Sequence, residues 1–253
     1  MTSPNASQAV ASVAAEPRLA ARIDRRASAR PSWMWVHMLL IGGLVVAPFD
    51  LRIMAAIHAR LGGFLAHEHP FHLVPYVTVQ WASAALVVWA LLGCLERAPR
   101  RFFISRAASA RLVVGGALGV GLLLNVLAKS WWGRPRPKQL LEFGGTRAFR
   151  AVWNPDFGAH GTSFASGHSG AAALCIGLVW LVAEPRRARV LMLWLVPAWL
   201  WVALSRIASG GHFPSDVLIG SWLALAPLLA MERWLGPLHP VAPVEAPALP
   251  RDR

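Results

Sequence analysis

The chain has 253 residues, of which 56% are hydrophobic and only 15% are charged, and its mean hydropathy is +0.47. Because soluble domains carry about 25% charged residues, this composition excludes an ordinary soluble protein and predicts a membrane protein. The formal net charge of +13 would suit a nucleic-acid binder, but such binding needs a solvated basic face, and here the arginines fall mostly between apolar runs. We therefore expect a lipid bilayer as the partner, and no nucleic acid.

Six apolar runs approach the roughly 20 helical residues that cross a bilayer core about 30 Å thick. In chain order they cover residues 33–48, 74–95, 112–129, 168–183, 190–207 and 216–235. The pattern predicts an all-α protein, a bundle of six transmembrane helices that forms one domain over residues 33–235. The flanking segments 1–32, rich in Ala, Ser and Arg, and 236–253, rich in Pro, are predicted to be disordered cytoplasmic tails.

The distribution of Lys and Arg predicts the orientation, because these residues favour the cytoplasmic side. With the N-terminus inside, 16 of the 25 basic residues fall in cytoplasmic tails and loops. Of the other nine, four belong to or adjoin the motifs described next: Lys129, Arg134, Arg136 and Arg206. The predicted localisation is the inner (plasma) membrane of a bacterial-type cell, with these motifs facing the periplasm.

Three short motifs fall on this outer side, each beside an apolar run. The motifs are Lys129, six residues, then Arg136-Pro137; Ser166-Gly167-His168; and Ser205-Arg206, five residues, His212, three residues, Asp216. The third motif would arise by chance in a chain of this length on the order of one time in a thousand. Their common location predicts one site built from all three.

The cations in these motifs suit a phosphoryl group, which carries charge on three oxygens during transfer. Lys129 supplies a compact charge, whereas Arg136 and Arg206 supply planar forks that each bind two oxygens. Pro135 and Pro137 restrict the backbone on both sides of Arg136. This combination predicts a phosphate-binding site.

The remaining motif residues indicate chemistry at that phosphate. Ser166 and Gly167 precede an apolar run, so backbone N–H groups at a helix N-terminus would face the anion. His168, with a reference pKa of about 6.5, is suited to donate a proton. Asp216 follows His212 by four residues, so we expect its carboxylate to bond one ring nitrogen and leave the other to attack phosphorus.

Together the motifs resemble the signature of the type 2 phosphatidic acid phosphatase (PAP2) superfamily: Lys-x6-Arg-Pro, Pro-Ser-Gly-His and Ser-Arg-x5-His-x3-Asp. The resemblance implies a PAP2-type helical bundle and a phosphatase with His212 as the nucleophile that becomes phosphohistidine. It further implies His168 as general acid, Asp216 as the residue that orients His212, and as phosphate ligands Lys129, Arg136, Ser166, Gly167 and Arg206. The chain departs from the pattern at Ala165, where the family has Pro.

We expect no cofactor and no metal, because the outer segments hold no acidic cluster for a pair of metal ions. The outer loop before the second span does contain His58, His67, His69 and His72. The His67-x-His69 spacing could hold zinc, but no residue that would orient the ligands can be inferred, and an interfacial loop is favoured.

The leading hypothesis is a membrane phosphatase that removes phosphate from a lipid. A phosphotransferase, in which a lipid hydroxyl replaces water, and a non-catalytic lipid carrier are the alternatives. The Phe-Gly-Gly element that begins at Phe143, with the aromatic residues after it, resembles lipid A phosphatases, so a lipid A-like substrate is favoured. Undecaprenyl diphosphate and phosphatidylglycerol phosphate stay open as substrates. Arg147 and Arg150 either meet a second phosphate or lie in a solvated loop. Sequence leaves the oligomeric state open.

Overall fold

The computed structural model describes residues 31–95, 104–159, 161–181 and 185–236. All the elements below lie in these ranges, and the compact unit runs from Trp35 to Leu238. The tails predicted at 1–32 and 236–253 lie outside the described residues, apart from residues 31, 32 and 236.

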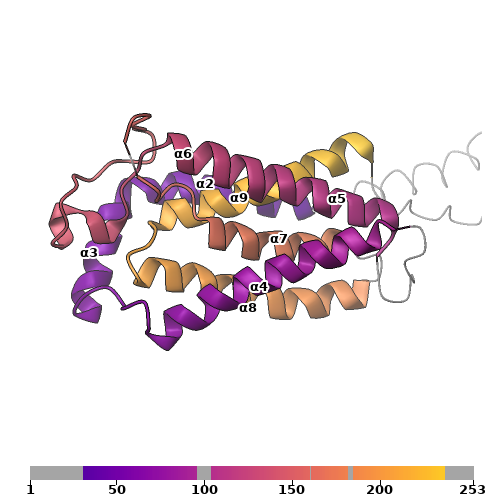
Figure 1. Cartoon of the computed structure of the whole chain (residues 1–253), viewed down its shortest axis with the longest axis horizontal. Coiled ribbons are helices and arrows are strands. Elements are labelled where there is room, and N and C mark those ends of the chain that lie inside the picture. The colour runs from indigo at the N-terminus through magenta and orange to yellow at the C-terminus, as the bar shows by residue number, and fades with distance from the viewer. Residues whose placement is uncertain (1–30, 96–103, 160, 182–184, 237–253) are drawn as a thin grey trace, which may run out of the picture. The chain divides into compact units, whose positions relative to one another are not determined.

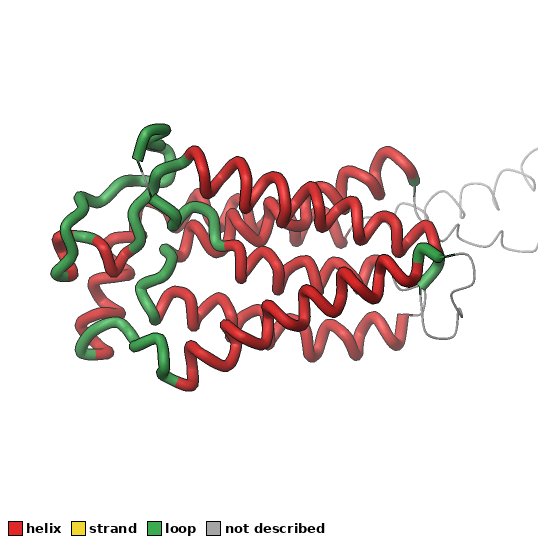
Figure 2. The backbone as a smooth tube through the Cα atoms, in the orientation of Figure 1, coloured by secondary structure: helices red, strands yellow, loops and turns green. Residues whose placement is uncertain are grey.

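The described residues contain helices and no strand, which confirms the all-α prediction. The sole β-like feature among them is an isolated bridge between Leu140 and Arg147. Figure 1 shows the helices, and Figure 2 shows the loops that join them. In chain order they are α2 (Pro31–Val46), η1 (Ala47–Phe49), α3 (Asp50–Leu61), α4 (Pro70–Gly93), α5 (Arg106–Gly116), the π-helical η2 (Ala117–Ala128), α6 (Lys129–Trp131), η3 (Pro137–Gln139), η4 (Leu141–Phe143), α7 (Gly167–Leu181), α8 (Pro185–Ala208) and α9 (Pro214–Leu235).

Five helical segments in this part of the chain are long and apolar enough to cross a membrane. They are Met34–Leu61, Pro70–Gly93, Arg106–Trp131, Arg186–Ala208 and Pro214–Leu235. The predicted fourth span corresponds to α7, whose 15 residues fall short of the roughly 20 that a bilayer core requires. The first span is longer than predicted, because η1 carries the helix on into α3 instead of ending it near Pro48.

The short helix α7 lies among longer ones and packs against α4, α8 and α9 (Figure 1). Nine of its 15 residues are buried, most of them Gly, Ala or Ser. Small side chains let neighbouring helices approach closely, as is usual for helix contacts within membranes. The position of α7 matters because its first turn carries the second motif.

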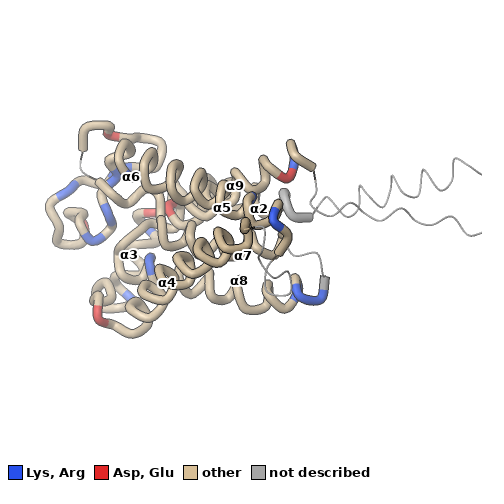
Figure 3. Tube along the Cα trace, turned by 45° about the vertical axis from the view of Figure 1, so that its right-hand side comes forward, with Lys and Arg blue, Asp and Glu red and all other residues tan. Residues whose placement is uncertain are grey.

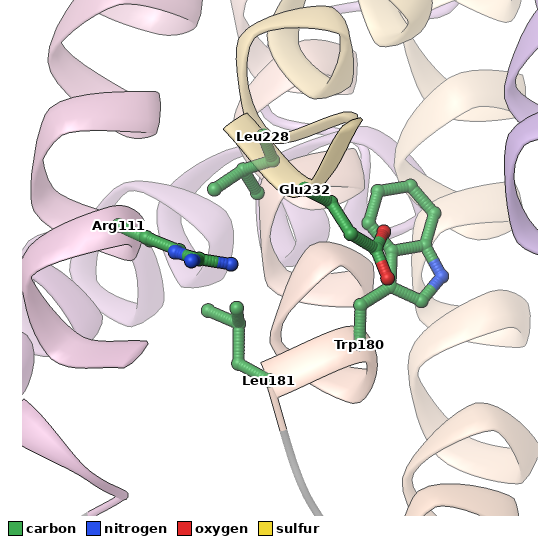
Figure 4. Close-up of a pocket in the computed structure, with 5 residues that line it drawn as sticks. All are labelled: Arg111, Trp180, Leu181, Leu228 and Glu232. Atoms are coloured by element: carbon green, nitrogen blue, oxygen red, sulfur yellow. The ribbon is translucent and has the colours of Figure 1, made fainter. Parts of the chain in front are cut away.

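The segments that carry the motifs lie toward one end of the helices. Figure 2 shows the long loop between α6 and α7 at the same end as α3. Most of the described charged residues lie toward the two ends of the helices, as Figure 3 shows. The other end contains a cavity of about 20 Å³ beside Arg111 and Glu232 (Figure 4), which has room for roughly one water molecule. The functional site is therefore expected at the end that carries the motifs.

Candidate active site

A pocket of about 130 Å³ lies where the three motifs meet. Its described lining includes no Asp or Glu, so the pocket is strongly positive. Besides Leu65, Ser209 and Gly211, the lining comprises the cations Lys129, Arg136, Lys138 and Arg206, the histidines His67, His72, His168 and His212, and Tyr76. The predicted convergence of the motifs on one site is therefore observed.

The cations are arranged to bind an anion. Nε of Arg136 and Nε of Arg206 are buried and have no hydrogen-bond partner among the described residues. Buried donors are rarely left unpaired, so a bound phosphate would satisfy both. Lys129 is positioned by Asn125, whose Oδ1 accepts a hydrogen bond from Nζ at 2.8 Å.

Two glycines make room for these cations. A Cβ atom on Gly167 would lie 2.9 Å from Nζ of Lys129, and one on Gly211 would lie 2.6 Å from Nη2 of Arg206. Both distances are closer than side-chain carbons approach such atoms. The glycines therefore allow the ammonium and guanidinium groups to lie against the backbone.

Lys138 is a fourth cation that the motifs do not contain. It follows Arg136-Pro137, and its backbone N–H donates to the carbonyl of Gly210 at 3.1 Å. Partial burial, then the nearby Arg136 and Arg206 guanidinium groups, lower the pKa of Lys138 below its ordinary value. This side chain is exposed, so it lies where an incoming anion would meet it early.

His212 is buried, with 2% of its surface exposed, and its Nδ1 lies 2.6 Å from the carbonyl oxygen of Ser163. A carbonyl can only accept, so Nδ1 carries the proton and the lone pair is on Nε2. Burial, reinforced by the charges of Arg206 and Arg136, lowers the pKa of His212 well below 6.5. The ring is therefore neutral near neutral pH, as an attacking imidazole must be.

Asp216 does not make the predicted bond to the His212 ring. Its Oδ2 accepts from the Ser163 hydroxyl at 2.6 Å and from the backbone N–H of Phe213 at 3.1 Å. The second contact is the usual one for an acidic residue in the first turn of a helix, whose side chain reaches back to the residue before the helix. Asp216 thus acts on His212 through Ser163, whose carbonyl holds the ring.

A buried ion cluster holds Asp216 in place. Arg134, 1% exposed, donates from Nη1 to Asp216 Oδ1 at 2.5 Å and from Nη2 to Asp50 Oδ2 at 2.9 Å. The Ser215 hydroxyl and backbone N–H also donate to Asp50, and the Arg134 guanidinium lies 4.0 Å from the Phe213 ring centroid. The cluster joins α3, the long loop and α9. Sequence reasoning missed Asp50, although an acid within an apolar span is itself a signal of function.

Ser166 is fully buried, and its groups have partners within the protein. Its backbone N–H donates to the carbonyl of Asp216 at 3.1 Å, and its hydroxyl donates to the Ser169 hydroxyl at 2.9 Å. Neither Ser166 nor Gly167 is among the described residues that line the pocket. Ser166 thereby ties the start of α7 to α9, and direct phosphate binding by Ser166 and Gly167 stays a prediction.

Helix α4 contributes side chains that the motifs do not reveal. Tyr76 stacks on the His168 ring, with centroids 4.3 Å apart and planes at 24°. Nε2 of Gln80 lies 3.3 Å from Nε2 of His168, and Nη1 of Arg206 lies 3.3 Å from Nε2 of His72. The sequence signal is a four-residue spacing of polar and aromatic residues within an apolar helix, which places them on one face.

The outer histidines have varied surroundings. His67 and His72 line the pocket with ring centroids 5.4 Å apart, His58 packs against Phe64, and His69 caps α4 by accepting from Phe71 N–H at 3.2 Å. In the described ranges, no group of three or more His, Cys, Asp or Glu side chains is placed to hold a metal ion. The predicted zinc alternative therefore gains no support from these residues.

Neither arginine proposed for a second phosphate lines the described part of the pocket. Arg150 pairs with Asp156 through Nη2 and Oδ2 at 2.7 Å, with both side chains partly exposed. Its carbonyl also accepts from Nε of Arg134 at 2.9 Å. The backbone of Arg147 pairs with Leu140. Arg150 thus supports the loop rather than the pocket lining.

Residues 110–239 match the family model described as "PAP2 superfamily". Three relatives are named Lipid A 4'-phosphatase. The one from Rhizobium leguminosarum is 33% identical over 224 residues, 79% of this chain and 93% of that protein. The one from Rhizobium etli is 32% identical over 64% of this chain and 62% of its own length, and that from Francisella tularensis subsp. novicida is 30% identical over 43% and 53%.

No solved structure matches the chain significantly. The family match spans just over half of the chain and includes the segment from Lys129 to Asp216 that holds all three motifs. The resemblance drawn from those motifs is thereby confirmed. The chain belongs to the PAP2 superfamily, and the cationic pocket that contains His168 and His212 is the candidate active site of a phosphatase.

Proposed function

We propose that the protein is an integral membrane phosphatase that hydrolyses a phosphorylated lipid through a phosphohistidine at His212. The observation that carries the proposal is the position of His212: a buried, neutral ring lines a pocket with four cations. The pocket suits a phosphoryl group, because cations stabilise the charge that develops during transfer. The apolar helices suit a bilayer, where a lipid substrate resides.

In the first step, the Nε2 lone pair of His212 attacks phosphorus and the phosphorus–oxygen bond to the lipid breaks. His168 donates a proton to the departing oxygen, so the lipid leaves as an alcohol. Lys129, Arg136 and Arg206 hold the phosphoryl oxygens. The Ser163 carbonyl bonds the Nδ1–H, so it favours the positive ring that forms in phosphohistidine.

In the second step, water attacks the phosphohistidine and the bond between nitrogen and phosphorus breaks. His168, now neutral, accepts a proton from the attacking water, and phosphate and free His212 result. Asp216 supports both steps by holding Ser163 through the 2.6 Å hydroxyl contact. Ser166 and Gly167 are proposed as further phosphate ligands, reached once substrate is bound.

Lipid A is the proposed substrate, because three relatives carry the name Lipid A 4'-phosphatase and the first covers most of this chain. Those relatives are named for the 4'-phosphate, so we expect removal there. The pocket is large enough for a phosphoryl group but not for the acyl chains of such a lipid. Selection between lipids therefore takes place in the parts of the chain around the pocket.

We further propose six spans in one domain over residues 33–235, with both termini cytoplasmic and the site facing the periplasm. The excess of basic residues in the segments assigned to the cytoplasm supports this orientation. Helix α7 would serve as the fourth span and complete the six. Its burial among longer helices makes its shortness tolerable, because little of its surface needs to meet lipid.

The test is phosphate release by the purified protein with lipid A, undecaprenyl diphosphate and phosphatidylglycerol phosphate, each with and without EDTA. We expect release from lipid A that survives chelation, with loss of the 4'-phosphate seen by mass spectrometry. The His212→Ala variant is the control for contaminating activity. Release from another lipid alone would identify that lipid as the substrate in place of lipid A. Phosphate that appears on a second lipid would indicate transfer instead of hydrolysis.

A further inference from the structure

We propose that helix α4 supplies the residues that position the proton donor: Tyr76 and Gln80 hold the His168 ring, and His72 holds Arg206 beside it. The inference rests on the proposed function, because it concerns the step in which His168 protonates the departing oxygen. Helix α4 precedes residues 110–239, the part of the chain that matches the family model. The three motifs contain none of these three residues.

The spacing of the three residues explains how one helix reaches both partners. His72, Tyr76 and Gln80 follow one another at intervals of four residues, so they form a row on one face of α4. That face meets α7, which carries His168, and α8, which carries Arg206. The row therefore lies against residues of the second and third motifs.

Tyr76 fixes the plane of the donor ring. The two rings are stacked with centroids 4.3 Å apart, within the range of favourable offset stacking. The Arg206 guanidinium carbon lies 5.1 Å from the same Tyr76 ring centroid, a cation–π distance. One aromatic side chain thus contacts both a proton donor and a phosphate ligand, and sets their relative position.

Gln80 fixes the rotation of the donor ring. Its side-chain nitrogen lies 3.3 Å from Nε2 of His168. An amide presents either a donor or an acceptor, so it can bond Nε2 whether or not that atom carries a proton. With Nε2 held, Nδ1 is the nitrogen left to donate to the departing oxygen.

The location of Gln80 strengthens this interpretation. Gln80 lies well inside an apolar helix of 24 residues that is long enough to cross a membrane. Polar side chains at such depth are costly and usually face a functional group. The described side-chain partner of Gln80 is His168, the catalytic histidine proposed here.

His72 completes the row and lines the pocket. It is 3% exposed, and its Nε2 lies 3.3 Å from Nη1 of Arg206. Arginine only donates, so Nε2 of His72 accepts and the ring is neutral with its proton on Nδ1. A neutral histidine here holds the arginine without competing for the negatively charged substrate.

The experiment compares leaving groups in Gln80→Leu, Tyr76→Leu and Tyr76→Phe proteins. Substrates are an alkyl phosphate, whose departing oxygen needs a proton, and nitrophenyl phosphate, whose oxygen does not. We expect Gln80→Leu and Tyr76→Leu to lower kcat for the alkyl phosphate roughly 10- to 100-fold, with a much smaller change for nitrophenyl phosphate. Tyr76→Phe keeps the stacked ring and should recover most of the activity that Tyr76→Leu loses with the alkyl phosphate.

Two controls separate positioning from general damage. Thr78→Val alters an exposed polar residue on the same helix and should change neither rate. Combining Gln80→Leu with His168→Ala should cause no loss beyond that of His168→Ala alone, because the residue acts through that ring. Equal losses with both substrates, or an additive loss in the double variant, would overturn the proposal.

A second measurement does not depend on activity. Nitrogen-15 spectra of the histidine rings, with His168 identified from the His168→Ala protein, should show its Nε2 resonance shift in Gln80→Leu and stay unchanged in Thr78→Val. An unchanged His168 resonance in Gln80→Leu would contradict the positioning role even in an active enzyme. Absence of phosphate release by the wild type, with the resonance shift present, would instead contradict the proposed function.

Discussion

The carbonyl oxygen of Ser163 lies 2.6 Å from Nδ1 of His212 and fixes the tautomer of the ring. Burial and the Arg206 and Arg136 charges lower the pKa of His212 well below 6.5. The free ring is therefore neutral at and above pH 6.5 and binds a second proton only at a distinctly lower pH.

The tautomer leads to a direct prediction. In nitrogen-15 spectra of the protein without substrate, His212 should show a protonated Nδ1 and a bare Nε2 at pH 7, and the same pattern at pH 6. The His212→Gln protein identifies the resonances. A ring that carries its proton on Nε2, or that titrates near pH 6.5, would contradict the proposed role as nucleophile.

The buried cluster around Arg134 predicts a large stability effect. Arg134→Met leaves the Asp50 and Asp216 carboxylates, both 0% exposed, without their cation. Breaking a buried ion pair by removing one partner typically destabilises a protein by about 3–5 kcal/mol. The measurement is the unfolding midpoint in detergent, with Arg52→Met, an exposed arginine on α3, as the matched control. Similar midpoints for the two variants would show that the cluster does not hold these elements together.

The four pocket cations should divide into two classes. Arg206 is 5% exposed and is proposed to bind the reacting phosphate, so Arg206→Ala should lower kcat roughly 100- to 1,000-fold. Lys138 is exposed, so Lys138→Ala should raise KM about tenfold or less, weaken the salt dependence of kcat/KM and leave kcat near wild type. Kinetics with nitrophenyl phosphate at several salt concentrations would separate the two effects. A large fall in kcat for Lys138→Ala would place that side chain at the reacting phosphate.

The proposed orientation predicts which positions react with a reagent that does not cross the membrane. With Cys94 and Cys175 replaced by Ser, a cysteine at Phe157, an exposed residue in the long loop before α7, should be labelled from the periplasm. A cysteine at Arg187, near the start of α8, should be labelled only after the membrane is opened. The reverse pattern would place the active site in the cytoplasm.

The sequence predicts the pocket well because each motif is short and its spacing is local. The turns that contain the motifs largely position Lys129 and Arg136, and likewise Arg206 and His212. The same residue types at the same spacing in another chain therefore indicate the same arrangement. The all-helical fold follows from apolar run lengths. The 15-residue α7 is an exception to this length rule, because contacts with neighbouring helices, and not its own length, make it stable.

The contacts between distant segments could not be predicted in the same way. In place of the bond expected between Asp216 and His212, the carboxylate accepts from Phe213 N–H and the Ser163 hydroxyl, and the ring bonds the Ser163 carbonyl. Asp50 and Arg134 are 84 residues apart, and Gln80 and His168 are 88 apart. Pairing across such separations depends on how the helices pack, which no local pattern specifies.

The central claim is that His212 carries the phosphoryl group, and rapid-quench labelling with a phosphorus-32 substrate tests it most directly. Nitrophenyl phosphate suits the experiment, because its departing oxygen needs no proton donor. We predict an acid-labile phosphoenzyme in the wild type and in the His168→Ala protein, and none in the His212→Ala protein. Label on the His212→Ala protein, with none on the His168→Ala protein, would contradict the account and exchange the roles of the two histidines.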